Sequence, residues 1–140
     1  MPWSASLQVG NDIAELSRLG AWVESWATQH RVADEMAQRI DLCATELVTN
    51  VITHGHSDAP ACVVELRIAD AGENLVLDID DDGVAFDPTL APLSAPVTMD
   101  SDRVGGWGMR IVRNLSDEVR YRRADGRNRL SLVFYPRPAA

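Results

Sequence analysis

The sequence contains no lysine, since all 13 of its basic residues are arginine. A Walker-type phosphate loop depends on a lysine that contacts the nucleotide phosphates, so that route to nucleotide binding is excluded. Acidic residues outnumber basic ones by 21 to 13, which gives a net charge of −8 over 140 residues. This acidic balance argues against a general nucleic-acid-binding protein.

Long apolar runs are also absent. No stretch approaches the roughly 20 residues that cross a bilayer, and the first residues lack the basic segment and apolar core of a secretory signal. We therefore expect a cytoplasmic protein with no membrane partner. The cysteines Cys43 and Cys62 lack metal-ligand spacing, and Cys43 lies on an apolar helical stripe. Both are interpreted as buried small hydrophobic residues rather than as a disulfide.

The length and composition suit one domain over residues 1–140, large enough to bury a core. Apolar side chains recur at a helical period over residues 12–29 and again from Arg31 to His54. Gly55 then follows as a helix-ending residue. The first third of the chain is therefore expected to form two helices.

The remaining sequence alternates between strand patterns and loops. Residues 61–68 and 75–79 predict an antiparallel hairpin, and a long aperiodic segment then leads to a glycine cluster. A short helix at 109–115 and a second hairpin, turned at the sequence RADGRN, complete the chain. This order predicts an α+β fold, a single-domain two-layer sandwich whose mixed or antiparallel sheet is covered on one face by helices.

Residues 78–83 read DIDDDG and match the opening of a calcium-binding EF-hand loop. Such a loop needs a bidentate glutamate at its twelfth position and flanking helices. The twelfth position is Thr89, directly after Pro88, and the preceding segment alternates like a strand. Calcium binding is therefore excluded.

The phase of the strand gives a different interpretation of this acidic stretch. Ile79 belongs to the inward-facing row, so Asp81 is expected to point inward as well. A buried carboxylate needs a partner, and an amino group on a flat ring would suit it, with Gly83 allowing close approach. Asp80 and Asp82 fall on the opposite face and are expected to be solvated.

Two further groups of residues suggest a site. Glu46 and Asn50 lie one helical turn apart on a shared face, where they could orient a nucleophile and ligate a hard cation. The cluster GGWG at 105–108 leads into a helix and could cradle a phosphate without lysine. Taken singly, each pattern is also typical of a solvated helix face, an ordinary turn or a flexible loop.

The order of these patterns resembles the ATP-binding domain of the GHKL superfamily, in particular the anti-sigma-factor serine kinases of the RsbW/SpoIIAB type. The stretch ELVTNVITHG is similar to the N box of that family, and DDDGVAFDP is similar to its G1 box. Its G2 box and last strand resemble GGWGMRIVRNLSDEVRY and NRLSLVF. The resemblance covers nearly the whole chain and implies the Bergerat, or GHKL ATPase-like, fold.

The resemblance also implies residue roles. Glu46 would be the catalytic base or water-positioning residue, and Asn50 would coordinate the Mg²⁺ that bridges the phosphates of ATP. Asp81 would accept from the adenine amino group, with Gly83 allowing the base to pack closely. An ATP lid would span about 84–107. The remaining cofactor-binding residues would come from the glycine cluster: Gly105, Gly106, Trp107, Gly108 and Met109.

The sequence departs from the family pattern at Ala85, where many members carry a second glycine, and at the bulky residues of the glycine cluster. His54 is interpreted as structural or pocket-lining, with a zinc pair of His54 and His56 as the alternative. Arg103 and Arg110 are the nearest candidates to replace the missing lysine, and a solvated surface role is the alternative for each.

The function that the resemblance implies is an anti-sigma factor and serine protein kinase. It would phosphorylate a STAS-type antagonist with Mg-ATP, sequester a sigma factor, and form a homodimer through a surface that includes Trp22, without binding nucleic acid directly. A module that binds ATP and acts by sequestration alone is the alternative. A histidine kinase catalytic domain and a fragment of a plain ATPase are less favoured, because each would need a further domain for its activity.

Overall fold

The computed structural model describes residues 4–10, 12–54, 63–90 and 104–137. In this part of the chain five strands, three α-helices and one short 3₁₀ helix follow one another. In chain order they are β1 (Ala5–Gly10), α1 (Glu15–Gln29), α2 (Asp34–His54), β2 (Val63–Ala71), β3 (Asn74–Asp81), η1 (Pro88–Leu90), α3 (Val104–Leu115), β4 (Glu118–Ala124) and β5 (Arg127–Phe134).

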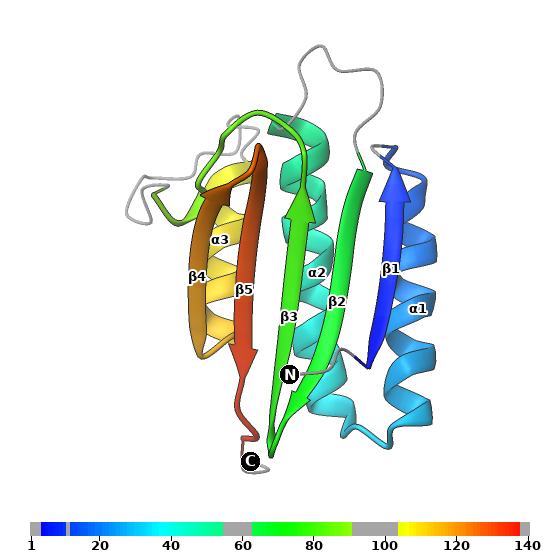
Figure 1. Ribbon diagram of the computed structural model, residues 1–140. Coiled ribbons are helices and arrows are strands. Elements are labelled where there is room, and N and C mark those ends of the chain that lie inside the picture. The colour runs from blue at the N-terminus through cyan, green and yellow to red at the C-terminus, as the bar shows by residue number, and fades with distance from the viewer. Residues whose placement is uncertain (1–3, 11, 55–62, 91–103, 138–140) are drawn as a thin grey trace.

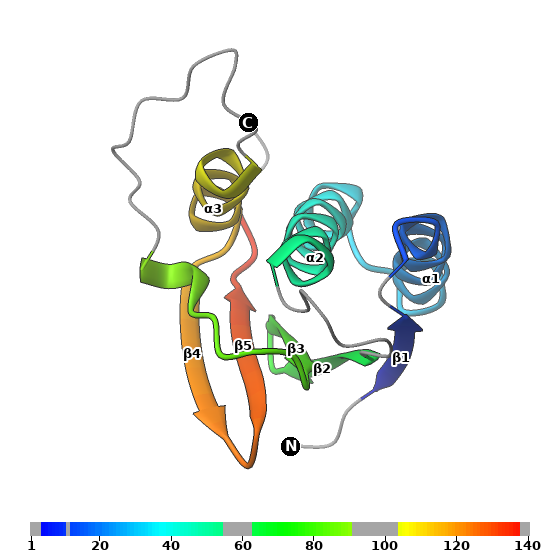
Figure 2. The same ribbon diagram turned by 90° about the horizontal axis from the view of Figure 1, so that it is seen from above.

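The strands form one sheet in the order β1-β2-β3-β5-β4, and every described neighbouring pair is antiparallel (Figure 1). All three helices lie on the same face of this sheet (Figure 2). The predicted two-layer α+β sandwich is therefore confirmed, with an antiparallel sheet rather than a mixed one. No described helix is both long and apolar enough to cross a membrane.

The core lies between the sheet and the helices because each strand turns alternate side chains inward. In β2 and β3 the inward residues Leu66, Ile68 and Leu77 are fully buried. The helices contribute a stripe at helical spacing, with Leu19 on α1 and Ile40 on α2 both buried completely. Burying one such side chain contributes about 1.5–3 kcal/mol, so these rows hold the two layers together.

Strand β1 was missed by the sequence analysis. It pairs with β2 so that Leu7 lies opposite Leu66 and Val9 opposite Val64. The alternation of apolar and polar residues at 5–9 was a usable signal for a strand. It is an edge strand, and Val9 is its one fully buried residue.

Both long helices begin three residues later than expected. Before α1, the Asp12 carboxylate accepts from the Ala14 N–H at 2.9 Å, which forms a turn. Before α2, Arg31 has a φ of 53°, in the left-handed region that a helix cannot include. In α1, Trp26 is buried as expected, whereas Trp22 packs against the core and is only partly exposed.

The second hairpin turns at Asp125 and Gly126, as predicted. Their φ angles are 54° and 74°, which is the pattern of a two-residue turn with both central residues left-handed. Glycine adopts this conformation without steric cost, and aspartate tolerates it better than most residues. The turn sets the register that places Asn128 opposite Arg123 and Arg129 opposite Arg122.

The face of the sheet away from the helices corrects one expectation. Asp82 is exposed as expected, but Asp80 is only 2% exposed. Its carboxylate pairs with Arg127, and the other oxygen accepts from Arg129 Nη2 at 2.8 Å. A buried carboxylate requires such partners, and the side-chain phase alone does not reveal that β5 supplies them.

The first aspartate of the EF-hand-like stretch, Asp78, is also buried on this outer face. It accepts from the Ser131 hydroxyl at 2.5 Å and lies 3.7 Å from Arg67. No group of three or more potential metal ligands occurs in the described part of the chain. Residues 78–81 of the acidic stretch are thus part of β3, and the carboxylates of Asp78 and Asp80 are used in ion pairs.

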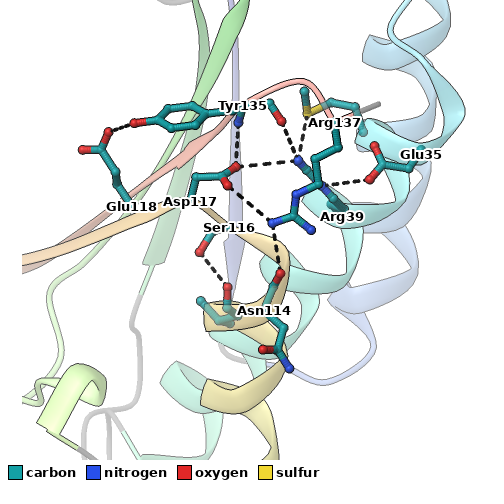
Figure 3. Close-up of polar contacts among 10 residues, drawn as sticks. Glu35, Arg39, Asn114, Ser116, Asp117, Glu118, Tyr135 and Arg137 are labelled. Carbon is teal, nitrogen blue, oxygen red and sulfur yellow. Dashed lines mark hydrogen bonds and ion pairs between the residues drawn. The ribbon is translucent and has the colours of Figure 1, made fainter. Parts of the chain in front are cut away.

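At the end of the molecule where β5 finishes, a buried arginine joins α2 to the last strand (Figure 3). Arg39 donates to the Tyr135 carbonyl at 2.7 and 3.0 Å and forms an ion pair with Glu35 at 3.2 Å. Its guanidinium lies 5.7 Å from the centre of the Phe134 ring. Asp117 accepts from the Tyr135 N–H at 2.7 Å, so the chain after β5 is held from two sides.

Candidate functional site

The elements that carry the predicted site residues meet at the opposite end of the molecule, and of those residues Asn50 and Asp81 line one cavity. Figure 1 shows that the C-terminal end of α2, the end of β3 and the start of α3 lie at this same end. Asp81, the last residue of β3, is 5% exposed and points toward the helices as expected. Its Oδ1 accepts from the Gly83 N–H at 2.9 Å and from Asn128 Nδ2 at 3.0 Å.

The second oxygen of Asp81, Oδ2, accepts no hydrogen bond from any described residue. It belongs to a side chain that lines a cavity, so it is placed to accept from a ligand. An ionised carboxylate is an acceptor only. The site therefore selects a ligand that presents a hydrogen-bond donor, such as the amino group of a flat ring.

Asn128 organises this corner of the site, and the sequence analysis missed it. Besides Asp81, its Nδ2 donates to the Val84 carbonyl at 2.8 Å. Its Oδ1 accepts from the Tyr121 hydroxyl at 2.5 Å and from the Phe86 N–H at 3.3 Å. All the donors and acceptors of the carboxamide are thus used. The signal was its phase, since Asn128 stands two residues before the buried Leu130.

The turn after β3 is held from the same hairpin. Arg123 Nη1 donates to the Gly83 carbonyl at 2.9 Å, and Gly83 itself is buried. Together with the bonds from Asn128, this contact fixes the segment that follows Asp81. Asp81 lines the cavity described next and Gly83 does not, so the role of Gly83 in the close approach of a base stays a prediction.

These residues border a small cavity of about 30 Å³. Its lining is mostly apolar, with polar groups from α2, β3 and the β4–β5 hairpin: Leu47, Asn50, Val51, Ile79, Asp81, Phe86, Pro88, Tyr121, Asn128 and Leu130.

Asn50 has an unusual environment on α2. It is 3% exposed, it lines the cavity, and its Oδ1 is buried without a hydrogen-bond donor in the described part of the chain. A buried acceptor of this kind is costly unless something satisfies it. An amide oxygen is also a suitable ligand for Mg²⁺, which usually takes one or two protein ligands together with phosphate oxygens and waters. Asn50 therefore fits the expected metal role.

Glu46 precedes Asn50 by one helical turn and is half-buried. It makes no hydrogen bond or ion pair with another residue that the structure describes. Its carboxylate is therefore available to a substrate group near Asn50, as general-base chemistry requires.

The glycine cluster lies in α3 and not in a loop before it. The helix begins at Val104, so Gly105 to Gly108 form its first turns, and their side-chain environments, including that of Trp107, lie outside the described part. The first N–H groups of a helix have no partner within it, so glycine costs less there and these groups can still meet a phosphate. Met109 is buried in the core and lies beyond the first four residues of α3, so neither its side chain nor its N–H is placed for ligand contact.

The lid remains a prediction. Of the expected span 84–107, the structure describes residues 84–90, which include η1, and residues 104–107, which belong to α3. The rest of that span, with Arg103, lies outside the described residues, as do Cys62, His56 and the side chain of His54. Arg110 is half-buried and has an interaction partner, so it is not a free phosphate ligand.

Comparison with known proteins adds to this geometry. Residues 9–134 match the family described as histidine kinase-like ATPase domain. The serine/threonine-protein kinase BtrW of Bordetella bronchiseptica is 31% identical over 119 residues, which are 84% of this chain and 83% of BtrW. Blue-light-activated histidine kinase 2 of Erythrobacter litoralis is 37% identical over 82 residues, which are 58% of this chain and 21% of that protein.

Solved structures share the fold. The RsbU and RsbW domains of Rv1364c from Mycobacterium tuberculosis superpose with a TM-score of 0.68 at 18% identity, covering 97% of this chain and 34% of that one. The histidine kinase domain of the Erythrobacter litoralis blue-light-activated kinase EL346 gives a TM-score of 0.56 at 22% identity, covering 87% and 59%. The predicted RsbW-like architecture is therefore confirmed as a fold.

Proposed function

Because the chain belongs to the histidine kinase-like ATPase family, we propose that it binds Mg-ATP at the cavity beside Asp81 and phosphorylates a serine of a partner protein. The observation that carries this proposal is the pair of unused acceptors in one cavity, Asp81 Oδ2 and Asn50 Oδ1. Asp81 Oδ2 suits the amino group of adenine, and Asn50 Oδ1 would suit a hard cation such as Mg²⁺. The likeness to a serine/threonine-protein kinase supports transfer to a hydroxyl.

Each residue has a distinct task in this proposal. Asp81 fixes the base, with Asn128 and Gly83 holding its other oxygen. Asn50 would hold Mg²⁺, and that ion would supply charge neutralisation at the phosphates. The first turn of α3 directs backbone N–H groups toward the phosphates. These contacts position the nucleotide, and phosphoryl transfer depends chiefly on such positioning.

The chemical step then needs one base. The serine oxygen attacks the γ-phosphorus, the bond to the β–γ bridging oxygen breaks, and ADP leaves with that electron pair. Glu46 accepts the hydroxyl proton as the new bond forms. A positioned general base of this kind typically contributes about 10²–10⁴-fold to the rate.

The proposed partners follow from the same family. We infer that the substrate is a STAS-domain antagonist, that the chain sequesters a sigma factor whenever this antagonist is not bound to it, and that the working unit is a homodimer. Phosphorylation adds nearly two negative charges at pH 7 and would release the antagonist. The sigma factor would then be bound again.

Transfer of the labelled γ-phosphate of ATP to a STAS-domain protein from the same organism tests the proposal. We expect serine phosphorylation by the unchanged chain, a loss of roughly 10²-fold or more in Glu46→Gln with ATP binding retained, and a loss of binding in Asp81→Asn. Glu73→Gln, at an exposed glutamate in the β2–β3 turn, is the matched control. ATP binding without transfer to any partner would instead favour sequestration alone, and no ATP binding would overturn both.

A magnesium titration isolates Asn50. Asn50→Ala should bind ATP in the absence of metal nearly as well as the unchanged chain but should gain little affinity when Mg²⁺ is added, because the one buried protein oxygen for the ion is gone. Thr53→Ala, at an exposed position on the same helix, should behave like the unchanged chain. If the ATP affinity of all three proteins depended equally on magnesium, Asn50 would not be a ligand of the metal.

A further inference from the structure

The outer face of the β4–β5 hairpin carries a group of arginines that the proposed catalysis does not use. Alternation along β5 turns Asn128 and Leu130 toward the helices, so Arg127 and Arg129 face the other way. Arg122 of β4 lies directly opposite Arg129 on this outer face. We call Arg122, Arg127 and Arg129 the arginine patch. In Figure 2 no helix lies on this side of the sheet.

Two of the three arginines share a single carboxylate. Arg129 donates to Asp80 Oδ2 through Nε at 3.0 Å and Nη2 at 2.8 Å, and Arg127 donates to Oδ1 through Nε. The hydrogen bond to Asp80 raises the pKa of Arg127 above its usual value. Both arginine side chains remain 38% exposed. Their remaining N–H groups, Nη1 and Nη2 of Arg127 and Nη1 of Arg129, make no hydrogen bond to the described residues.

The third arginine has no such partner. Arg122 is exposed and makes no hydrogen bond or ion pair with another described residue, although Arg129 stands opposite it. Like charges directly opposite one another destabilise a sheet. An anion placed between the two guanidinium groups would convert this repulsion into two attractions.

A cavity lies on the outer face of the hairpin, where such an anion would bind. It has a volume of about 50 Å³ and is lined by the arginine patch together with Asp80, Ala124 and Asp125. Three arginines and two aspartates line this cavity, so positive side chains outnumber negative ones within the lining, while the carboxylates of Asp82 and Glu65 act on Arg127 from outside it. Guanidinium groups match planar oxyanions with two parallel hydrogen bonds, so a carboxylate suits the remaining donors.

We propose that the arginine patch is a docking site for an acidic segment of a partner protein, with one carboxylate of that segment seated between Arg122 and Arg129. A nucleic acid fits less well, because a phosphate backbone would extend beyond three arginines and meet an otherwise acidic molecule. The proposal goes beyond phosphoryl transfer, since docking requires neither ATP nor Glu46.

The patch and the cavity beside Asp81 lie on opposite faces of the same strand ends. Asn128, between Arg127 and Arg129 in the chain, points into the cavity while its neighbours point away from it. A segment bound to the arginine patch would therefore contact the face of β5 that does not line the cavity. Docking and nucleotide binding can occur at the same time.

The test uses the ¹⁵N-labelled full chain and an acetylated hexaglutamate peptide as the probe, at low ionic strength. We expect saturable shifts of the Nε–Hε signals of Arg122 and Arg129, and a loss of these shifts as NaCl is added. Arg122→Gln should lower the affinity for the peptide by up to about fivefold, which is the upper range for one exposed ion pair. ATP affinity should not change in this variant, which separates the result from the proposed kinase function.

Arg120→Gln is the matched control, since Arg120 lies on the same strand and face but is 81% exposed and already pairs with Glu118 at 3.4 Å. It should change peptide affinity less than Arg122→Gln does. An equal loss of peptide affinity in both variants would mean that the peptide responds to general positive charge and not to the arginine patch. Signal shifts that do not saturate would mean that no specific site exists. Tighter binding of inorganic phosphate or of a single-stranded oligonucleotide at the same signals would also overturn the proposal.

Discussion

Asn128 donates from Nδ2 to the Oδ1 of Asp81 at 3.0 Å, although the two residues are 47 positions apart in the chain. The bond occupies one oxygen of the carboxylate and leaves the other facing the cavity. The position of Asp81 is therefore determined from two strands, β3 through its own backbone and β5 through this amide.

The first prediction concerns this bond. Asn128→Ala should lower ATP affinity about tenfold, which corresponds to 1.4 kcal/mol, because Asp81 loses the donor that orients it. Asn128→Asp should lower it further, since a second carboxylate would stand beside the first. Calorimetric titration with ATP measures both effects. Asn114→Ala, at an exposed asparagine of α3, is the control, and unchanged affinity in folded Asn128→Ala would contradict the role given to the amide.

The second prediction concerns Arg39, whose side chain is 4% exposed and joins α2 to the chain after β5. Arg39→Ala should lower the free energy of unfolding by about 1–3 kcal/mol, because the Tyr135 carbonyl loses its donor and the packing over Phe134 is lost. Urea denaturation measures this change. ATP affinity per folded molecule should stay the same, since Arg39 lies at the opposite end from the cavity. Arg120→Gln should change stability by less than about 0.5 kcal/mol.

The third prediction concerns the thiol of Cys43. Burial raises the pKa of this thiol to about 12, so almost none of it is thiolate, the reactive form, at pH 8. In a Cys62→Ser chain, a thiol reagent at pH 8 should therefore react with Cys43 only as fast as the protein opens, and urea should accelerate the reaction strongly. Rapid reaction under native conditions would contradict the buried position that both the sequence and the structure give to Cys43.

The fourth prediction concerns pH. Burial, and then the nearby Glu24, raise the pKa of Asp41 above its usual value, and its Oδ1 is buried without a partner among the described residues. A raised carboxyl pKa means that the folded state holds the proton more tightly than the unfolded chain. Stability is then lost as the pH rises through that pKa. Asp41→Asn should therefore increase the melting temperature at pH 7.

The control for Asp41 is the comparison across pH. Near pH 3 the carboxyl is protonated in the unchanged chain, so the difference in melting temperature between it and Asp41→Asn should shrink. Asp70→Asn, at an exposed aspartate of β2, should show no comparable difference. A lower melting temperature for Asp41→Asn at pH 7 would indicate instead that the ionised carboxylate stabilises the fold.

Local patterns were sufficient for part of the site. The inward position of Asp81 follows from the phase of one strand, and the shared face of Glu46 and Asn50 follows from one helix. Neither requires knowledge of which elements pack together. The hairpins were predictable for the same reason, because turn residues such as Asp125 and Gly126 act over a few positions.

The parts that were not predicted depend on distant pairing or on a competing local preference. Asn128 and the burial of Asp80 both arise from the pairing of β3 with β5, which no local pattern reveals. The low helix propensity of glycine favoured a loop before Met109, but α3 begins at Val104. At a helix start the cost of glycine is reduced, because the first N–H groups have no partner to lose.

The alternation of β5 has a consequence for how this protein can vary. Residues 127–130 contribute in turn to the arginine patch and to the cavity, so substitutions can alter either surface separately. A single inserted or deleted residue cannot alter one surface alone, because it would turn every following side chain of the strand to the opposite face. Related chains should therefore tolerate many exchanges within this strand and almost no change in its length, with length differences confined to the turn before it.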